Sequence, residues 1–399
     1  MSKMTVEDIS IQDQSVLMRV DFNVPVKSGR VTNDKRIRAA LPTMRYVLQQ
    51  GGKLILMSHL GRPKGERKPE YSLKPCVPLL AEHLGQPVAF ATDCIGEEVR
   101  EAVARLSSGQ VLLLENLRYH KGEEKNDPDF ARALSQWGDV FVNDAFGTAH
   151  RAHASTEGVT HYLQPCAAGY LMMKELEYLG RVTGSPQHPF VAILGGAKIS
   201  GKIDVIQSLL PKVDRLIIGG GMMFTFLRAK GLEVGRSLLE EDRIAMAKQL
   251  LDDAGDKILL PVDCRVSSQF DIQSGHVAQL RTVPVNAIPS DSSGLDIGPD
   301  TIDAFGKALA GARMIVWNGP MGVFEIAQTA EGTFKMARVL ADLTSQGAIT
   351  VIGGGDSAAA AEKAGVADRI SHISTGGGAS LEFLEGKTLP GVAALTENE

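Results

Sequence analysis

The sequence predicts an α/β protein made of two doubly wound domains with mainly parallel sheets. Short apolar, β-branched runs recur along the chain with helix-like stretches between them, and this alternation is typical of parallel sheets. Polar and glycine-rich motifs follow directly after these runs, which matters because such sheets bind ligands beyond the carboxyl ends of their strands. The 399 residues are enough for two large domains.

The expected strands are short runs that stop at turn-forming or polar residues. In chain order they lie near residues 16–20, 53–57, 88–91, 111–114, 140–143, 190–194, 215–218, 257–260, 313–317, 348–352 and 370–374. Between the fifth and sixth runs, Tyr170–Leu179 has helical spacing of apolar residues, and a loop follows at 184–189. We therefore predict a connecting helix and hinge at 171–188, between a first domain of residues 1–170 and a second of residues 189–379.

Composition and charge exclude several classes of protein. The chain is 44% hydrophobic and 22% charged, which is typical of folded proteins, and it has no apolar run long enough to span a membrane. Acidic residues near the start argue against a signal peptide, and four widely spaced cysteines fit reduced thiols in a cytoplasmic protein. The net charge of −5 argues against nucleic-acid binding.

In the first half of the chain, the segments after the strands are rich in arginine and histidine. Arginine binds carboxylate and phosphate through two parallel hydrogen bonds, so residues converging from several strand ends would form a pocket for a small phosphorylated acid. Each arginine taken alone also fits a solvated surface, and His150 and His153 also fit structural hydrogen bonding. The set comprises Asp21, Asn23, Arg36, His59, Arg62, Arg118 and Arg151.

In the second half, glycine-rich loops follow the strands. The run Ile349–Ile352 ends at Gly353, Gly354 and Gly355, and a helix-forming alanine stretch follows Asp356 and Ser357. Glycines let backbone N–H groups approach a phosphate at a helix N-terminus. Asp356 would repel that phosphate unless a metal ion bridged them, and Mg²⁺ is the usual ion. The alternative is a tight turn without a ligand.

Two near-matches to nucleotide-binding motifs separate the remaining classes. Residues 196–202 match G-x-x-x-x-G-K, but Ile203 replaces the Ser or Thr that would hold the metal, which again points to Asp356. Residues 353–358 match the dinucleotide loop G-x-G-x-x-A, but the next strand ends at Ser374-Thr375 rather than at an acidic residue. A nicotinamide dehydrogenase is therefore disfavoured.

Taken together, these segments resemble phosphoglycerate kinase over nearly the whole chain. The matching segments are DFNVP at 21–25, SHLGRP at 58–63, ENLRYHKGEE at 115–124, VNDAFGTAHRAHAS at 142–155, GGAKISGKI at 195–203, GGGM at 219–222, WNGPMGVFE at 317–325, GGGDS at 353–357 and STGGGASLEFLEGKTLPG at 374–391. The resemblance implies a monomeric, cytosolic glycolytic enzyme that passes a phosphoryl group between ATP and 3-phosphoglycerate. It also places the tail, residues 380–399, in the first domain.

The resemblance also implies residue roles. Asp21, Asn23, Arg36, His59, Arg62, Arg118 and Arg151 would bind 3-phosphoglycerate, with Arg36 and Lys202 balancing charge during transfer. Lys198, Lys202, Glu325, Gly353, Gly354, Gly355, Asp356 and Ser357 would bind the nucleotide, with Asp356 as the metal residue and further backbone donors at 376–378. One departure is Ser293, where the family usually has an apolar residue.

The reaction needs positioning and charge neutralisation rather than a general base, because the attacking oxygen is already ionised at neutral pH. This explains why arginines, lysines and glycine loops are present without a nucleophile–base pair. Since the two sets of residues lie in different halves, we expect the active-site cleft between the domains. The alternative is a non-catalytic nucleotide-binding or scaffold protein on the same fold.

Overall fold

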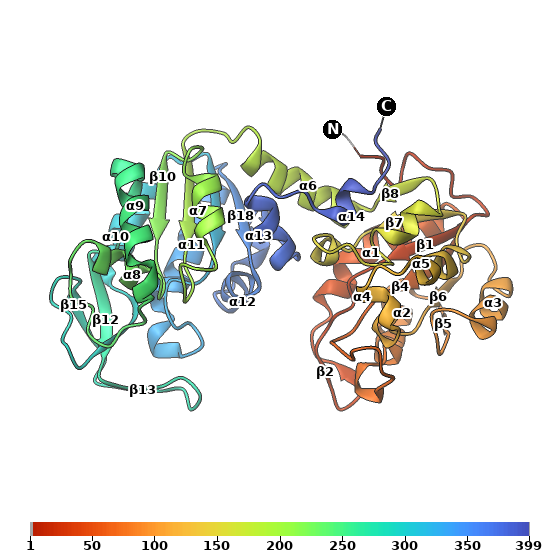
Figure 1. The fold of residues 1–399 in the computed structure, drawn as a ribbon, viewed down its shortest axis with the longest axis horizontal. Helices are drawn as coiled ribbons and strands as arrows, with labels where there is room; N and C mark the ends of the chain where they lie inside the picture. Colours follow the sequence, from red (N-terminus) through yellow and green to blue (C-terminus); the bar gives the residue numbers. More distant parts are fainter. Residues whose placement is uncertain (1–2, 399) are drawn as a thin grey trace. The chain divides into compact units, whose positions relative to one another are not determined.

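The computed structural model describes residues 3–398, which fold into two compact units. Unit 1 holds the described residues up to Glu177 together with those from Thr388 onward, and unit 2 runs from Tyr178 to Lys387 (Figure 1). Helix α6 (Tyr170–Thr183) therefore begins in unit 1 and ends in unit 2. Unit 2 extends to Lys387 rather than to residue 379, because α13 (Gly378–Leu384) packs against α7 (Ile203–Leu209).

Unit 1 is built on a six-stranded parallel sheet in the order β5-β6-β4-β1-β7-β8. Its strands are β1 (Ser15–Arg19), β4 (Lys53–Met57), β5 (Val88–Phe90), β6 (Val111–Leu113), β7 (Val140–Asn143) and β8 (Cys166–Ala168). The sequence predicted all of them except β8, whose Cys-Ala-Ala sequence has little intrinsic strand preference.

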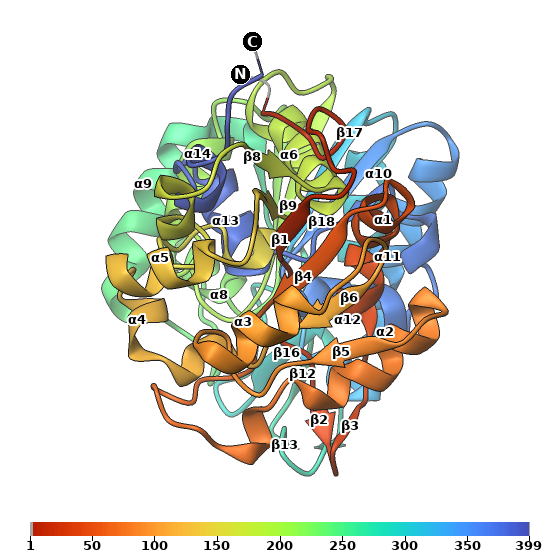
Figure 2. The same cartoon turned by 90° about the vertical axis from the view of Figure 1, so that its right-hand side faces the viewer.

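Helices cover both faces of this sheet, and Figure 2 shows α1 and α2 on one side and α4 and α5 on the other. Right-handed crossovers place the helices on both faces, because the chain first adds strands on the β5 side of β1 and later adds strands on its β8 side. The helices are α1 (Lys35–Gln49), α2 (Val77–Leu84), α3 (Glu97–Ala104), α4 (Lys121–Glu124) and α5 (Pro128–Ser135), with α14 (Pro390–Ala393) from the tail. A small hairpin, β2 (Val26–Lys27) and β3 (Arg30–Val31), follows β1.

Unit 2 is built on a second six-stranded parallel sheet, in the order β11-β10-β9-β17-β18-β19. Its strands are β9 (Phe190–Leu194), β10 (Arg215–Ile218), β11 (Ile258–Leu259), β17 (Met314–Asn318), β18 (Ile349–Gly353) and β19 (His372–Ile373). Every one was expected from the sequence. Numbered along the chain, the order is 3-2-1-4-5-6, which is that of dinucleotide-binding sheets.

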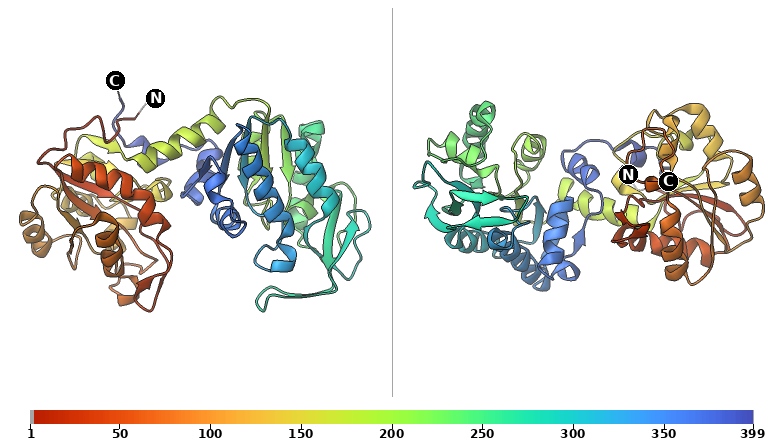
Figure 3. Two further views of the ribbon diagram at one scale, coloured as in Figure 1. Left: turned by 180° about the vertical axis from the view of Figure 1, so that it is seen from behind. Right: turned by 90° about the horizontal axis from the view of Figure 1, so that it is seen from below.

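The helices of unit 2 again form two layers, which the view from below in Figure 3 shows on opposite sides of the sheet. One layer holds α7, α8 (Met223–Ala229) and α9 (Ile244–Ala254). The other holds α10 (Pro299–Leu309), α11 (Glu331–Ser345) and α12 (Gly355–Lys363). The expectation of an α/β protein with two parallel-sheet domains is therefore confirmed.

Residues 263–297 form antiparallel structure that the sequence did not predict. A three-stranded sheet has the order β15-β12-β16, with β12 (Asp263–Ser267), β15 (Arg281–Pro284) and β16 (Ser293–Ile297). The hairpin β13 (Gln269–Asp271) and β14 (His276–Ala278) extends from it. These strands are short, polar and rich in turn residues, so they lack the continuous apolar runs that marked the parallel strands.

The central strands of both sheets are buried, as their apolar runs required. In unit 1 the core residues include Val16, Met18, Leu54 and Leu56, which have no exposed area. The four cysteines are all buried and free, in agreement with the expected reduced thiols. Among residues 3–398, no helix is both long enough and apolar enough to cross a membrane.

Candidate functional site

The sheet of unit 1 has a point where the strand order reverses, between β1 and β7. Loops on either side of such a point diverge, and the crevice that they leave at the carboxyl edge is the usual ligand site of open α/β sheets. The loop after β1 carries Asp21 and Asn23, and the loop after β7 leads to Arg151. Fold topology therefore places these predicted residues at one edge of one sheet.

Three predicted residues form a hydrogen-bonded cluster after β1. Nη1 of Arg36, in the first turn of α1, is 3.1 Å from Oδ1 of Asp21 and donates to the carbonyl oxygen of Asn23 at 3.0 Å. The amide of Asn23 accepts a hydrogen bond from the Gly61 backbone N–H at 2.9 Å. Asp21 therefore holds Arg36 in place. This contact gives the Asp21 carboxylate a role beside an anion site, where a carboxylate without such a partner would repel the anion.

The other predicted arginines lie near one another. Arg118 is buried, donates from Nη1 to the carbonyl of Gly61 at 2.8 Å, and has Nε 3.5 Å from Glu124. Burial lowers the pKa of Arg118, and the neighbouring charges of Arg151 and Arg62 lower it further. Arg62 is exposed and Arg151 half-buried, so both have room to reach a ligand.

His59 lies in the middle of this cationic cluster and is 3% exposed. Its pKa is lowered well below the ordinary value by burial first, and then by the charges of Arg19, Arg118, Arg36 and His153. His59 is therefore uncharged at neutral pH. A site with several arginines and a neutral imidazole suits an anion that carries more than one negative charge.

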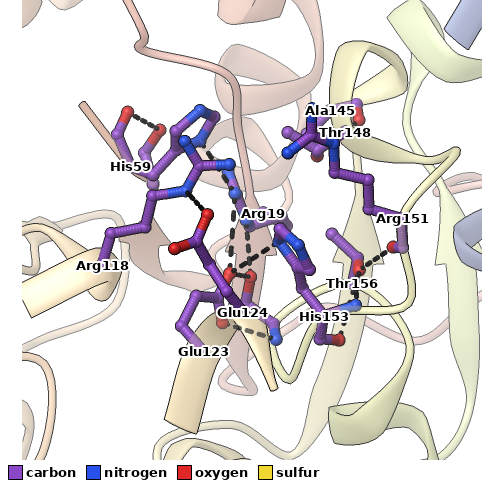
Figure 4. A network of polar contacts seen from close by, with 12 residues as sticks. Arg19, His59, Arg118, Glu123, Glu124, Ala145, Thr148, Arg151, His153 and Thr156 are labelled. Carbon is purple, nitrogen blue, oxygen red and sulfur yellow. Dashed lines mark hydrogen bonds and ion pairs between the residues drawn. The ribbon is translucent and has the colours of Figure 1, made fainter. Parts of the chain in front are cut away.

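Beneath these residues lies a buried polar network that sequence reasoning missed. Figure 4 shows Arg19, Glu123 and His153 in contact beside His59 and Arg118. Arg19 and Glu123 are both fully buried, with 3.9 Å between Nη2 and Oε1. The available signal was an arginine inside a run that was otherwise read only as an apolar strand, since a buried charge requires a partner.

The two histidines left without a role have structural contacts. The imidazole Nε2 of His150 accepts a hydrogen bond from Nε of Arg151 at 3.1 Å. His153 is 6% exposed, and burial together with Arg118 lowers its pKa to about 3. His150 therefore supports Arg151, and His153 adds no charge of its own at neutral pH.

The sheet of unit 2 reverses its strand order between β9 and β17, and a cavity of about 400 Å³ opens there. The loops after β9, β10 and β17 line it with glycines and with Pro320 and Met321. Apolar side chains form much of the remaining wall, and Glu325 and Asp356 lie at its polar part. The apolar wall suits a nucleotide base, and a carboxylate such as Glu325 suits ribose hydroxyls.

Several exposed apolar side chains belong to this one cavity. Leu238, Phe270 and Ile272 are 46%, 37% and 52% exposed, and all three line it. These apolar side chains are open to water inside a concave site. Binding of a ligand that covers them is favourable, because it removes apolar surface from water. Phe270 and Ile272 come from the unpredicted hairpin, so sequence reasoning could not place them here.

The predicted glycine loop ends at the N-terminus of α12. Gly354 is the N-cap with φ of +89°, a conformation that favours glycine, and no side chain caps the helix. The first backbone N–H groups of α12 are therefore available to an anion. Ser357 is buried, and its hydroxyl accepts a hydrogen bond from the Gly319 N–H at 2.6 Å, which braces the loop after β17.

Asp356 has the properties of a magnesium residue. It is exposed, lies in the first turn of α12, and has no hydrogen bond or ion pair with any of residues 3–398. Mg²⁺ takes hard oxygen ligands and is commonly held by one or two carboxylates together with substrate phosphates. The free carboxylate beside an uncapped helix N-terminus fits that donor set.

Lys202 is half-buried in unit 2, and its Nζ donates a hydrogen bond to Oδ1 of Asn318 at the end of β17. Burial lowers the pKa of Lys202 to about 8, and the negative charges of Asp356 and Glu385 partly oppose this. Lys198 is exposed on the same loop. Asn318 was not singled out from the sequence, although it follows directly after an expected strand.

One further group of metal-ligating side chains lies in unit 1, where Asp93, Cys94 and His120 have their ligand atoms within 4.8 Å of one another. The Asp93 carboxylate already accepts hydrogen bonds from Nε2 of His120 and from the backbone N–H of Cys94, both at 2.7 Å, and it pairs with Arg67. Its charge is therefore compensated without an ion, and the group is explained as a structural network.

Comparison with known proteins gives a consistent result over nearly the whole chain. Residues 6–387 match the family model described as phosphoglycerate kinase. The chain is 58% identical to the phosphoglycerate kinase of Chloroherpeton thalassium, over 99% of this chain and 100% of that protein. It is equally identical to that of Chlorobaculum tepidum, over all of both chains.

Solved structures agree with the sequence comparison. The structure of phosphoglycerate kinase from Coxiella burnetii has a TM-score of 0.88 and 40% identity, and covers 98% of both chains. That from Pyrococcus horikoshii has a TM-score of 0.85 and 34% identity, also over 98% of both chains.

Proposed function

The chain belongs to the phosphoglycerate kinase family, and we propose that its unit 1 residues hold the phosphoglycerate while its unit 2 residues hold the nucleotide. The enzyme transfers a phosphoryl group reversibly between ATP and the carboxylate of 3-phosphoglycerate in glycolysis, giving 1,3-bisphosphoglycerate and ADP. Nothing in the comparisons favours a non-catalytic scaffold. The assignment of residues is supported by one observation: in each unit, candidate residues follow both of the strands between which the strand order reverses.

In unit 1, charge and geometry suit the binding of the phosphorylated acid. Arg62, Arg118 and Arg151 supply planar donors, and His59 adds a neutral hydrogen-bonding group in the same cluster. Asp21 and Asn23 act on Arg36, because both hold its Nη1. Arg36 would keep Nη2 for the group in transfer.

In unit 2, the cavity would take the nucleotide with the base against its apolar wall and the ribose near Glu325. The uncapped start of α12 at Gly354 and Gly355 would receive phosphate oxygens, with Gly353 preceding it. Lys198 and Lys202 would add positive charge. Asp356 would hold Mg²⁺, which supplies charge neutralisation to the phosphates when it is bound.

Transfer then requires little covalent help from the protein. The carboxylate of the acid attacks the terminal phosphorus of ATP in line with the leaving ADP oxygen, and no proton has to be removed. Arg36 and Lys202 would offset the negative charge that gathers on the transferring group. Because the reacting atoms must come within about 3–3.5 Å, we propose that the units close when both substrates are bound.

A coupled assay tests the function directly. Purified full-length protein with MgATP and 3-phosphoglycerate should give ADP at a rate that depends on both substrates, with little ADP when the acid is omitted. Nucleotide binding by calorimetry without any turnover would support the scaffold alternative instead. We further propose that the enzyme is monomeric and cytoplasmic, and sedimentation analysis of the active protein would test the first of these.

A further inference from the structure

Arg19 lies at the end of β1, directly under the phosphoglycerate residues, and has no exposed area. Its guanidinium has a partner on each side (Figure 4). Nε donates to the hydroxyl of Ser155 at 2.8 Å, Nη1 donates to the carbonyl of Val20, and Nη2 is 3.1 Å from Nδ1 of His59. Arg19 is therefore not exposed to the substrate site itself and is linked to it through its contact with His59.

The contact between Arg19 and His59 decides where the imidazole proton lies. A guanidinium has only N–H donors and stays protonated, so the nitrogen facing it must be an acceptor. Nδ1 of His59 is therefore unprotonated, and the single proton of the neutral ring is on Nε2. None of residues 3–398 forms a hydrogen bond with Nε2, which leaves this N–H for a ligand.

Neighbouring groups hold Arg19 in this position and balance its charge. The Ser155 hydroxyl accepts from Arg19 and donates to Oε1 of Glu123 at 2.6 Å, and the Ser155 backbone N–H donates to Oε2 at 3.0 Å. Nη2 of Arg19 lies 3.9 Å from Oε1 of Glu123. A buried guanidinium with a paired, hydrogen-bonded carboxylate is a rigid arrangement, because breaking either partner leaves an uncompensated charge.

We propose that Arg19 is a positioning residue for phosphoglycerate binding, which fixes His59 as the Nε2–H tautomer so that a neutral donor meets the anionic substrate. The other tautomer would present a lone pair to a substrate oxygen and repel it. The proposal rests on the proposed function in one respect, the contact of His59 with the acid. The charged or titratable groups near His59 are Arg19, Arg36, Arg118 and His153, from four different segments.

The tautomer can be measured in the unaltered enzyme. Long-range ¹H–¹⁵N spectra of the full-length protein, labelled at histidine, distinguish the two neutral tautomers from the imidazolium. The signals of His59 are assigned by their loss in His59→Gln, and the exposed His276 serves as an internal reference. We expect the Nε2–H tautomer of His59 throughout pH 5.5–8. An Nδ1–H tautomer or an imidazolium within that range would overturn the proposal.

The effect on binding is tested with a variant that leaves no buried charge unpaired. Arg19→Met combined with Glu123→Gln removes both members of the pair at similar volume. At pH 8 the KM for 3-phosphoglycerate should rise about tenfold relative to the unaltered enzyme, since a fixed donor is lost. The KM for ATP should be unchanged. Arg100→Gln, at an exposed position of α3, is the matched control and should change neither constant.

A pH series separates positioning from a general structural effect. Without Arg19, His59 loses the largest of the neighbouring charges that lower its pKa beside burial, so it takes a proton at a higher pH than in the unaltered enzyme, which restores a donor with added charge. The ratio of variant to unaltered KM for the acid should therefore shrink towards one between pH 8 and 5.5. A ratio that is unchanged over this range, or no rise in KM at pH 8, would contradict the proposal.

These results are distinguishable from a failure of the proposed function. If the unaltered enzyme lacked turnover that depends on 3-phosphoglycerate, the function would be wrong, whatever the tautomer. If the double variant did not fold, the tautomer measurement on the unaltered enzyme would still test whether His59 has the tautomer that the contact with Arg19 requires.

Discussion

Nζ of Lys202 donates a hydrogen bond to Oδ1 of Asn318, which ties the loop after β9 to the end of β17. These are the two strands between which the order of the second sheet reverses. Lys202 is thus held at the crevice as a largely buried cation whose pKa is lowered to about 8 by that burial. Its charge should therefore depend on pH within a range that kinetics can reach.

We predict that kcat/KM for MgATP falls as the pH rises through about 8. Lys202 is positive below its pKa and neutral above it, so the attraction for phosphate is lost on the alkaline side. The pH dependence of kcat/KM reports the pKa values of groups in the free enzyme. Lys202→Arg keeps a charge at all these pH values and should abolish the fall, even if its activity is lower. A profile of the unaltered enzyme that is level from pH 7 to 9.5 would contradict the role of Lys202.

Arg36→Ala should lower kcat by about 10²–10³, which is typical of removing one donor of transition-state charge. The KM for ATP should stay nearly constant, because Arg36 belongs to unit 1. Steady-state kinetics with both substrates varied would measure this, with Arg38→Ala as the control on the same helix, where the side chain is 55% exposed. If kcat were unchanged and only KM for the acid rose, Arg36 would provide uniform binding instead.

Asp356→Asn should weaken the response of the enzyme to Mg²⁺ more than it weakens the binding of metal-free nucleotide. The free carboxylate attracts the ion but repels bare phosphate, so its loss removes an attraction for the ion and removes no attraction for metal-free nucleotide. Activity titrated against Mg²⁺ should need about tenfold more ion for half its maximum, the equivalent of about 1.4 kcal/mol. Asp368→Asn, at an exposed position after α12, is the matched control. An unaltered magnesium dependence would disprove the metal role.

Asp144→Asn should be more stable than the unaltered protein at pH 8. Asp144 is buried, its Oδ1 accepts the Met172 backbone N–H at 3.1 Å at the start of α6, and Oδ2 is buried without a partner. Burial raises the pKa of Asp144 to about 7. Because the folded state holds the proton more tightly than the unfolded chain, Asp144 stabilises the protein at low pH and loses that contribution as the pH rises through about 7.

Denaturant unfolding of both proteins from pH 4 to 8 would measure this effect. The difference in unfolding free energy between Asp144→Asn and the unaltered protein should grow by at most about 1.4 kcal/mol per pH unit up to pH 7. Asp296, whose pKa burial also raises to about 7, contributes equally to both proteins and cancels in the difference. A difference that does not change with pH would show that Asp144 does not titrate in this range.

The sequence predicted the parallel sheets well because their strands are continuous apolar runs, as at Phe190–Leu194, where every residue is buried. It failed where the strand signal is weak, as at Cys166–Ala168 and in the antiparallel sheet and hairpin of residues 263–297. Motifs that follow strand ends indicated the candidate site residues, since topology places strand ends together. Arg19 was not predicted as a site residue, because its function depends on contacts with Ser155 and His59 that are remote in sequence.

Unit 1 is completed by residues that follow the whole of unit 2 along the chain. The Gly391 backbone N–H donates to the carbonyl of Ala149, that of Thr396 donates to Cys166, and that of Met4 donates to Thr396, at 2.8, 2.9 and 2.9 Å. A ribosome therefore releases every residue of unit 2 before it releases the segment that closes unit 1. During synthesis, unit 2 can finish folding first, while unit 1 waits with its β7–β8 edge uncovered.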